Sequence, residues 1–233
     1  MKLLENKWAL VTGSSRGIGQ QIALGLAQRK CNVIVHGRTK SHGAQTLQLL
    51  QPYGIKTYMV YGELNRSEDL QAIIQAVKTG LGVVDILYNN AAIQSKWKPI
   101  WEFSEAEWLE TFQVNVFAMI TLCNAFAPEM KKRGFGRIIN LTSGIKDIPQ
   151  LVPYSVSKAA VDKYSCDLAA ELRGTNVLVN YLDPGWLKTD LGGPNADNSV
   201  ETVLPGALVP ALLEDNGPTG QFFAAQNYKV LER

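Results

Sequence analysis

Three side chains in the second half of the chain form a pattern suited to proton transfer. Tyr154 and Lys158 are four residues apart, so on a helix they lie on one face, one turn apart. A free tyrosine has a pKa of about 10, and a neighbouring cation favours the phenolate and lowers that pKa. Ser143 comes just after an apolar run, and its hydroxyl can hold a carbonyl oxygen. We expect Tyr154 to exchange a proton with a substrate; a surface Tyr–Lys pair and an ordinary loop serine are the alternatives.

A glycine-rich turn near the N-terminus forms a second pattern. Residues Thr12–Gly19 read TGSSRGIG and lie between an apolar run and a helical stretch. Glycines allow close approach of the backbone, and the start of a helix offers free N–H groups to a pyrophosphate. We predict a dinucleotide site here, with a plain strand-to-helix turn as the alternative. The residues expected to contact the cofactor in this turn are Gly13, Ser15, Arg16, Gly17, Ile18 and Gly19.

The charge at the end of the second expected strand indicates which dinucleotide binds. A protein that uses NAD usually has Asp or Glu there, about 20 residues after the glycine turn, to hold the ribose hydroxyls. Here Gly37 is followed by Arg38, whose planar guanidinium can pair with a 2′-phosphate. Arg16 can approach the same phosphate from the glycine turn. We therefore predict NADPH in preference to NADH; two solvated surface arginines are the alternative.

The elements that must position these residues alternate along the chain. Apolar runs typical of strands lie at 8–12, 32–36, 56–60, 85–88, 137–141, 176–182 and 221–224. Helical stretches lie at 17–29, 41–50 and 152–173. Two further helices are expected, one that begins at Ser67 as its N-cap and one that runs from Ser104 towards Lys132. Strands separated by helices pair in parallel through right-handed crossovers. The sequence predicts one α/β domain over 1–233: a Rossmann-type, doubly wound sheet of about seven mostly parallel strands with helices on both faces.

One late segment departs from this alternation. Residues 192–218 are rich in Gly, Pro, Asn and Asp, and we expect a loop with a short helix near 200–213. Long irregular segments in compact domains often serve function. We predict a substrate loop or lid at about 189–215.

Composition excludes several other classes of protein. The 233 residues include 23 Lys+Arg against 21 Asp+Glu, and this balance disfavours a broad electrostatic grip on nucleic acid. Cys31, Cys123 and Cys166 form neither a disulfide framework nor a zinc pattern, which fits a reducing cytosol. His36 and His42 lack neighbouring ligand residues, so we expect no metal. With neither a secretory N-terminus nor an apolar run of eighteen residues, we expect a soluble cytoplasmic protein without a membrane partner.

The ordered set of motifs resembles the short-chain dehydrogenase/reductase family over nearly the whole chain. The motifs are Thr12–Gly19, Asn89-Asn90-Ala91-Ala92, Asn115 within Val-Asn-Val, Ser143, Tyr154–Lys158 and residues 183–190, DPGWLKTD. The resemblance implies that Tyr154 is the proton donor or acceptor and that Ser143 positions the substrate oxygen. It also implies that Lys158 binds the nicotinamide ribose and tunes Tyr154, while Asn115 supports a water-linked proton relay.

The resemblance implies further cofactor contacts. They are Asn90, Ala91, Glu63, Leu64, Pro184, Gly185, Leu187 and Thr189, together with Tyr154 and Lys158. Glu63 and Leu64 are expected near adenine, and the segment from Pro184 to Thr189 near nicotinamide. The chain departs from the family pattern at Ala92, where glycine is usual, at Glu63, where aspartate is usual, and in a shorter loop before Tyr154.

Neighbouring residues supply expectations about the substrate pocket. Ile145, Gln150 and Trp186 lie next to the expected active residues in sequence, and we predict that they line the pocket. A separate aromatic group, Trp97, Trp101, Phe103 and Trp108, is expected to pack mainly in the core, with a pocket or an interface as alternatives.

Residues 189–194 and 217–223 look similar to the carbonyl reductase branch of the family, which is NADPH-linked. We therefore expect an NADPH-dependent enzyme that reduces a ketone or aldehyde to an alcohol, with Tyr154 as general acid/base. A 3-oxoacyl-carrier-protein reductase, an alcohol or sugar dehydrogenase, and a non-catalytic NADP(H)-sensing regulator remain alternatives. The resemblance also implies a homodimer or homotetramer that assembles through the helices expected at 104–132 and 152–173.

Overall fold

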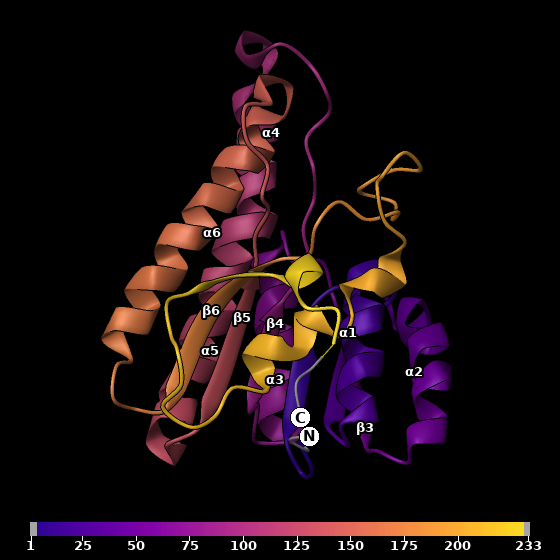
Figure 1. Cartoon of the computed structure of the whole chain (residues 1–233), viewed down its shortest axis with the longest axis vertical. Coiled ribbons are helices and arrows are strands. Elements are labelled where there is room, and N and C mark those ends of the chain that lie inside the picture. The colour runs from indigo at the N-terminus through magenta and orange to yellow at the C-terminus, as the bar shows by residue number, and fades with distance from the viewer. Residues whose placement is uncertain (1–3, 231–233) are drawn as a thin grey trace.

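Parallel strands form the centre of this molecule. The structure is a computed structural model, and it describes residues 4–230. Within that range a seven-stranded sheet has the order β3-β2-β1-β4-β5-β6-β7, and every neighbouring pair is parallel (Figure 1). The strands are β1 (Trp8–Val11), β2 (Asn32–Gly37), β3 (Thr57–Tyr61), β4 (Ile86–Asn89), β5 (Gly136–Leu141), β6 (Val177–Asp183) and β7 (Phe222–Ala224). The predicted Rossmann-type sheet is confirmed.

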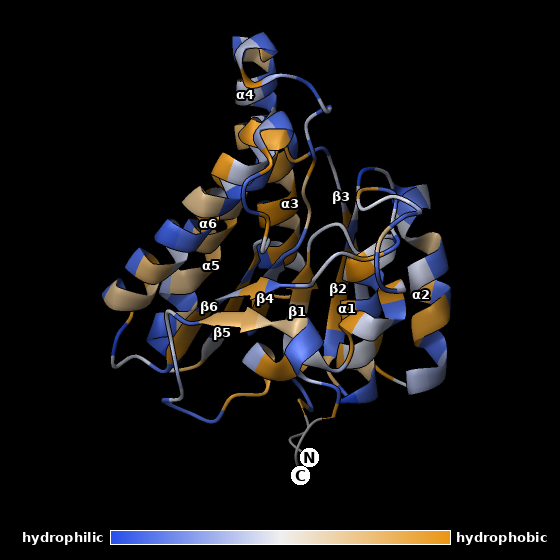
Figure 2. Ribbon diagram, turned by 45° about the horizontal axis from the view of Figure 1, so that its top comes forward, coloured by the Kyte–Doolittle hydropathy of each residue, from blue (hydrophilic) through white to orange (hydrophobic). Residues whose placement is uncertain are grey.

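Helices cover both faces of the sheet. They are α1 (Gly17–Gln28), α2 (Ala44–Leu50), α3 (Ser67–Gly80), α4 (Glu105–Phe112), α5 (Ala118–Arg133) and α6 (Val152–Glu171). One apolar core joins the sheet to α1 and α2, and a second joins it to α3, α5 and α6. Along β1, Ala9 and Val11 belong to the first core and Leu10 to the second, so both faces of the strand are buried, as parallel sheets require. Figure 2 shows hydrophobic residues along the strands and mixed colours on the outer helices.

One helix starts where the sequence predicts, and another lacks the expected N-cap. Ser104 caps α4 through a capping box with Glu107. The prediction that Ser67 caps α3 is wrong: Arg66 holds the N-cap position in extended backbone, and Ser67 is the first helical residue. Asp69, in the first turn of α3, stabilises the preceding loop instead. Its carboxylate accepts a hydrogen bond from the Glu63 N–H at 2.9 Å.

Two expected helices are divided. The helix predicted from Ser104 towards Lys132 is interrupted by a π-helical turn at Gln113–Phe117, between α4 and α5. The short helix predicted near 200–213 is two 3₁₀ helices, Val200–Val203 and Gly206–Ala211. The segment 200–211 follows the surface of the first apolar core, against which Val203 and Ala207 are fully buried. Contact with that surface explains why it forms two short helices instead of one.

The aromatic group after β4 does not pack as expected. Trp97 is 63% exposed and Trp101 is 83% exposed. The segment that carries them runs above the end of the sheet beside α4 (Figure 1), away from both apolar cores. The prediction that these two tryptophans are core residues is therefore wrong.

Candidate functional site

The glycine turn joins β1 to α1 and leaves the start of that helix open. Gly13 has a left-handed backbone, φ +64°, and its N–H donates to His36 Nδ1 at 2.9 Å. A Cβ at Gly19 would lie 2.5 Å from the Gly13 carbonyl oxygen, so only glycine allows the helix to approach the turn this closely. Arg16, the N-cap residue, makes no side-chain capping bond. The first N–H groups of α1 can therefore bind an anion such as a pyrophosphate.

Thr12 ties the end of β1 to the end of β4. Its Oγ1 accepts hydrogen bonds from the N–H groups of Asn90 at 2.9 Å and Ala91 at 3.0 Å. The Asn90 side chain donates to the Thr12 carbonyl at 2.8 Å and to the Gly13 carbonyl at 3.3 Å. Two predicted cofactor residues are thus brought against the glycine turn. The sequence signal for Thr12 is its place as the first residue of the TGSSRGIG motif.

The two predicted phosphate-binding arginines lie on adjoining segments. Arg38 is exposed at the end of β2, and the hydrogen bond from the Ser14 N–H to the His36 carbonyl, at 3.0 Å, holds that strand end beside the glycine turn. Arg16 Nη1 lies 3.0 Å from Asp190 Oδ2, in an ion pair that motif reasoning does not foresee. Both partners are largely exposed, and such pairs contribute little to stability. Arg16 can therefore exchange this carboxylate for another anion.

The other predicted residues of the glycine turn lie beside these groups. The Ser15 carbonyl accepts a 3.3 Å hydrogen bond from Gln20 Nε2, and Ile18 packs against the first apolar core. Across from them, the Thr189 methyl group would lie 3.7 Å from a Cβ placed on Gly17. The glycine turn and the segment after β6 therefore face each other.

Tyr154 and Lys158 lie one turn apart on α6, and both are buried. Lys158 Nζ donates to the Leu141 carbonyl at 2.8 Å, at the end of β5, and lies 5.6 Å from the centroid of the Tyr154 ring. The Tyr154 hydroxyl interacts with the Ser143 side chain. The structure thus brings the three residues of the proton-transfer pattern together at the carboxyl end of β5.

Burial dominates the acid–base behaviour of this group. It raises the pKa of Tyr154 to about 12; the hydrogen bond with Ser143 acts in the lowering direction, and the Asp183 carboxylate in the raising direction. Burial also lowers the pKa of Lys158 to about 8, against the raising influence of Asp162 and Asp183. The net shift of the Tyr154 pKa is therefore upward, the opposite of the lowering expected from a neighbouring cation, because burial dominates. At pH 7, Tyr154 is a neutral proton donor and Lys158 carries its positive charge.

Asn115 lies within the π-helical turn and is tied to both sides of the site. Its Oδ1 accepts a hydrogen bond from the Ile93 N–H at 2.9 Å, and its Nδ2 donates to the Ile93 carbonyl at 2.9 Å. The same Nδ2 donates to Ser157 Oγ at 3.0 Å, and Ser157 Oγ donates to the Tyr154 carbonyl at 2.6 Å. Ser157 therefore joins Asn115 to the helix turn of Tyr154. Its signal in the sequence is its place inside the Tyr154–Lys158 motif.

A narrow cavity connects several predicted residues. Leu64, Ala91, Asn115 and Lys158 all line it, together with Leu141 at the end of β5. Residues from the β3–α3, β4 and β5 strand ends thus meet α6 at one place. Ligand sites of open α/β sheets lie at such carboxyl ends.

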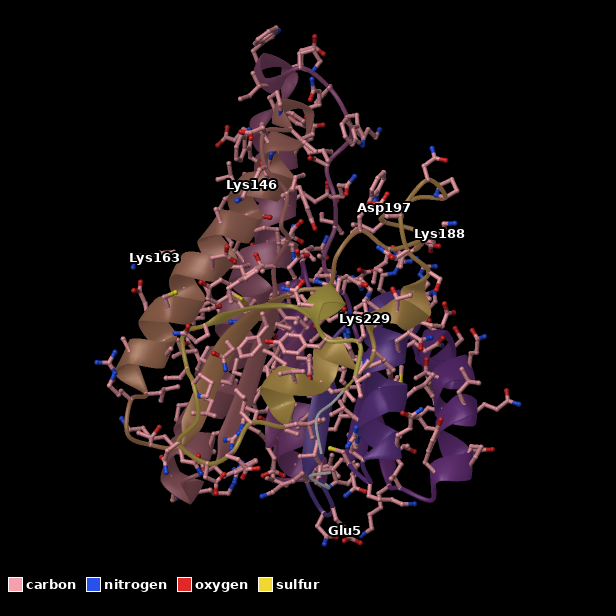
Figure 3. The ribbon with its side chains drawn as sticks, viewed as in Figure 1. Glu5, Lys146, Lys163, Lys188, Asp197 and Lys229 are labelled. Carbon is pink, nitrogen blue, oxygen red and sulfur yellow. The ribbon has the colours of Figure 1, made fainter. Side chains whose placement is uncertain are left out.

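The segment after β6 supplies the remaining predicted cofactor residues. Asp183 Oδ1 accepts the Gly185 N–H at 2.9 Å, and the Pro184 carbonyl accepts Gln226 Nε2 at 3.0 Å. Leu187 is buried and forms a β-bridge with Asn198. Figure 3 shows Lys188 and Asp197 on this irregular segment, above the sheet.

The three predicted substrate-pocket residues are placed differently from one another. The Ile145 N–H donates to Ser143 Oγ at 3.2 Å, so Ile145 is joined to the candidate site directly. Gln150 is exposed, and its carbonyl accepts the Lys98 N–H at 3.3 Å. Trp186 is half-exposed, and its ring N–H donates to the Gly192 carbonyl at 2.8 Å. Gln150 and Trp186 thus lie on the loops after β5 and β6.

His36 makes the stability of the protein sensitive to acid. Burial lowers the pKa of His36 to about 4, from an ordinary value of 6.5. Below pH 6.5 His36 binds a proton in the unfolded chain, whereas in the native state it does so only near pH 4. The free energy of unfolding therefore keeps the whole His36 contribution above pH 6.5 and loses it as the pH falls towards 4. We expect a loss of about 3 kcal/mol in the free energy of unfolding over this window.

Denaturant unfolding between pH 4 and 7 measures this dependence. His36→Phe should remove the histidine part of the slope, whereas the control His42→Asn, at an exposed position, should keep it. An identical slope in the wild type and His36→Phe would contradict the prediction.

Residues 4–230 lack two features that would indicate other classes of protein. No helix there combines the length and apolar character that crossing a bilayer demands. In the same range, no cluster of three or more His, Cys, Asp or Glu side chains is arranged to hold a metal ion.

Comparison with known proteins agrees with this geometry. Residues 7–199 match the family model described as short chain dehydrogenase. The chain is 37% identical to dehydrogenase/reductase SDR family member 4 of Sus scrofa over 191 residues, which cover 81% of this chain and 68% of the relative. The chain resembles the structure of a gluconate 5-dehydrogenase from Burkholderia cenocepacia J2315 in complex with NADP and tartrate, with a TM-score of 0.85, 25% identity and coverage of 95% and 94%.

A second solved structure has the same fold. A 3-oxoacyl (acyl-carrier-protein) reductase from Agrobacterium tumefaciens C58, with NADP bound, aligns with a TM-score of 0.86, 26% identity and coverage of 95% and 93%. The family model spans more than half of the chain. The chain belongs to the short-chain dehydrogenase family and is an NAD(P)-dependent oxidoreductase acting on CH–OH and C=O groups.

Proposed function

We propose that the protein reduces a ketone or aldehyde to an alcohol with NADPH, and that Tyr154 is the general acid. The observation that carries this proposal is the buried Tyr154 hydroxyl beside Ser143, one helical turn from the Lys158 ammonium. Since burial keeps Tyr154 protonated at neutral pH, the side chain holds the proton that reduction of a carbonyl consumes.

The proposed division of labour follows from these positions. When bound, NADPH supplies a hydride to the carbonyl carbon. The Ser143 hydroxyl orients the carbonyl oxygen, and the Tyr154 phenol donates its proton to that oxygen as negative charge develops. An alkoxide is a far stronger base than a phenolate, so the transfer is downhill even from a tyrosine of raised pKa. The Lys158 ammonium then stabilises the phenolate, and Asn115 keeps α6 in register through Ser157.

The residues present fit a dinucleotide. The close packing of Gly13 and Gly19 and the open start of α1 form a cradle for a pyrophosphate. We assign cofactor contacts to this turn, to Arg38, to Glu63 and Leu64 after β3, to Asn90 and Ala91 after β4, to Tyr154 and Lys158 on α6, and to Pro184, Gly185, Leu187 and Thr189 after β6. We further propose that residues 189–215 act as a lid over the substrate, because Thr189 faces the glycine turn.

Arg38 is the proposed determinant of the preference for NADPH. We expect Arg38→Ala to raise the KM for NADPH by about 10- to 100-fold, because a charge-assisted hydrogen bond to a phosphate is lost, and to leave the KM for NADH unchanged. Steady-state kinetics with each cofactor measures this. Arg173→Ala, an exposed arginine just after α6, is the control and should change neither constant. A wild type that prefers NADH would refute the role of Arg38.

The substrate class is tested by a panel of carbonyl compounds. NADPH oxidation is followed with ketones, aldehydes, 3-oxoacyl thioesters and keto sugars, and we expect the simple ketones and aldehydes to be reduced fastest. The two NADP-bound structural neighbours, a gluconate 5-dehydrogenase and a 3-oxoacyl (acyl-carrier-protein) reductase, make sugars and thioesters the necessary comparisons. Fast turnover of one of these instead would move the protein to that substrate class. Tight NADPH binding without any turnover would favour a cofactor-sensing regulator.

We also propose a homodimer or homotetramer that assembles through α4, α5 and α6. Leu109, Phe117 and Val156 are exposed apolar residues on these helices and the π turn between them, and solvent-facing groups of this kind favour an interface. The mass of the assembly in solution tests this pairing.

The three cysteines are free, which supports a reducing cytoplasmic location.

A further inference from the structure

His36 lies outside the proton-transfer group, yet it is one of the most completely bonded side chains near the candidate site. It is 2% exposed at the end of β2. Its Nδ1 accepts the Gly13 N–H at 2.9 Å, and its Nε2 lies 3.2 Å from the Gly62 carbonyl oxygen. One imidazole therefore connects the glycine turn after β1 with the loop after β3.

These partners determine which ring nitrogen carries the proton. A backbone N–H can only donate, so Nδ1 must be unprotonated where it meets Gly13. A carbonyl oxygen can only accept, so Nε2 carries the hydrogen and donates to Gly62. Both contacts are made by the neutral ring alone, since an imidazolium would direct an N–H at the Gly13 N–H. The native environment favours this form, because burial holds the pKa of His36 at about 4.

The backbone of His36 strengthens the same connection. Its carbonyl accepts the Ser14 N–H at 3.0 Å, and its own N–H donates to Ser14 Oγ at 3.0 Å. On the opposite side of the turn, Asn90 Nδ2 donates to the Gly13 carbonyl at 3.3 Å. The peptide groups on both sides of Gly13 are therefore held, one by His36 and the other by Asn90.

The position of Gly13 governs the start of α1. The Gly13 carbonyl lies so close to Gly19 that a Cβ there would be 2.5 Å from its oxygen. A shift of Gly13 therefore moves the surface against which the first turn of α1 packs, and with it the N–H groups that face a pyrophosphate. The Gly62 contact acts on the other loop, which leads directly into Glu63 and Leu64.

We propose that His36 is a positioning residue for the cofactor: its neutral imidazole holds the glycine turn and the β3–α3 loop at the separation that the adenosine half of a dinucleotide requires. This inference rests on the dinucleotide site assigned above. A loop that is ordered before binding loses less conformational freedom when the ligand arrives, so its loss weakens affinity more than it changes chemistry. His36 touches neither Tyr154 nor Lys158, and the rate at saturating cofactor should be preserved.

Three substitutions separate the two hydrogen bonds. His36→Phe keeps the ring and removes both bonds. His36→Asn places Oδ1 where Nδ1 lies and keeps the acceptor for Gly13, while His36→Gln places an amide near Nε2 and keeps the donor to Gly62. His42→Asn, on the exposed side of the chain after β2, is the control. The readouts are the Kd for NADPH and for NADH by fluorescence titration, kcat and KM for NADPH, and the melting temperature.

The expected pattern is a split between affinity and rate. His36→Phe should weaken NADPH binding about tenfold, because it leaves the partly buried Gly13 N–H without its acceptor, with kcat at saturating NADPH unchanged. His36→Asn, which keeps the acceptor for Gly13 but loses the bond to Gly62, should restore part of that affinity, and His42→Asn should match the wild type. A lower melting temperature in His36→Phe with an unchanged Kd for NADPH would overturn the proposal, since the ring would then serve folding alone.

Two other outcomes also decide the question. Where His36→Phe does not fold, the Asn and Gln variants are compared: tighter NADPH binding by His36→Asn supports the proposal, and equally weak binding by both contradicts it. A wild type that binds neither NADPH nor NADH overturns the dinucleotide site itself. That failure is distinguishable from failure of the His36 role, in which the wild type and His36→Phe bind NADPH equally well.

Discussion

Tyr154→Phe is expected to lower kcat for carbonyl reduction by about 10²- to 10⁴-fold, the range that removal of a general acid produces. The substitution deletes one hydroxyl that interacts with Ser143 and keeps a ring of nearly the same size in the same buried place. Without that hydroxyl, Ser143 can still orient the carbonyl oxygen, but the proposed general acid is gone. Turnover at a substantial fraction of the wild-type rate would refute the role of Tyr154.

The same variant should bind NADPH with nearly wild-type affinity. Lys158 is held by its hydrogen bond to the Leu141 carbonyl, which does not involve the Tyr154 hydroxyl, so the proposed ribose contact stays in place. Tyr164→Phe is the matched control, because Tyr164 lies on the same helix and its hydroxyl reaches Asn124 instead of the candidate site. Fluorescence titration with NADPH, beside steady-state kinetics, separates loss of chemistry from loss of binding.

The fold is largely predictable because local patterns and tertiary structure agree along most of the chain. Apolar runs such as 137–141 become strands buried on both faces, and their boundaries move by about one residue in β5, Gly136–Leu141. The differences arise where long-range contacts decide. The helix expected from Ser104 onwards contains a π turn that places Asn115 against Ile93 and Ser157, residues 22 and 42 positions away. Periodicity within one segment carries no information about such partners.

The candidate site divides in the same way. Motifs predict which side chains meet at the strand ends, and Ser143, Tyr154 and Lys158 do meet there. They do not predict the contacts that hold backbone groups, such as His36 on Gly13 or Thr12 on Asn90. Histidine considered only as a metal ligand or a catalytic base gives no reason to single out His36. Its role depends on a hydrogen bond between two separate strand ends.

The sign of the Tyr154 pKa shift shows why spacing alone does not determine electrostatics. The interval from Tyr154 to Lys158 predicts a cation beside a phenol, and that neighbour exists. The depth of burial and the position of Asp183 come from packing, and together they raise the pKa of Tyr154 to about 12. The result favours proton donation over proton abstraction in the unliganded protein. A neutral Tyr154 is the form that the proposed reduction requires as its proton donor.

Lys158→Met is expected to remove both functions that Tyr154→Phe separates. Methionine matches the length of the lysine stem but carries no charge and no donor, so the phenolate of Tyr154 and the proposed ribose contact both lose their partner. We expect kcat/KM to fall by about 10²-fold or more and the Kd for NADPH to rise about tenfold, because hydrogen bonds from charged donors are among the stronger ones. Lys163→Met is the control on the same helix: Lys163 is exposed and projects outward from α6 (Figure 3).

The pH dependence of kcat/KM tests the role of Lys158 independently of the variant's loss of activity. Burial lowers the pKa of Lys158 to about 8, so the ammonium is present below pH 8 and is lost as the pH rises through that value. Wild-type kcat/KM for reduction should therefore decline above about pH 8, and the residual activity of Lys158→Met should lack that decline. Equal declines in the wild type and in Lys158→Met would assign this titration to another group.

Stability measurements then distinguish a functional lysine from a structural one. A pKa lowered from 10.5 to about 8 means that burial disfavours the Lys158 ammonium by about 3 kcal/mol relative to the unfolded chain. Methionine removes that penalty but leaves the Leu141 carbonyl without its donor, which costs about 1–3 kcal/mol. The two effects nearly cancel, so Lys158→Met should unfold at about the denaturant concentration of the wild type while being almost inactive. Unchanged stability together with lost activity would show that the Lys158 ammonium serves the reaction and not the fold.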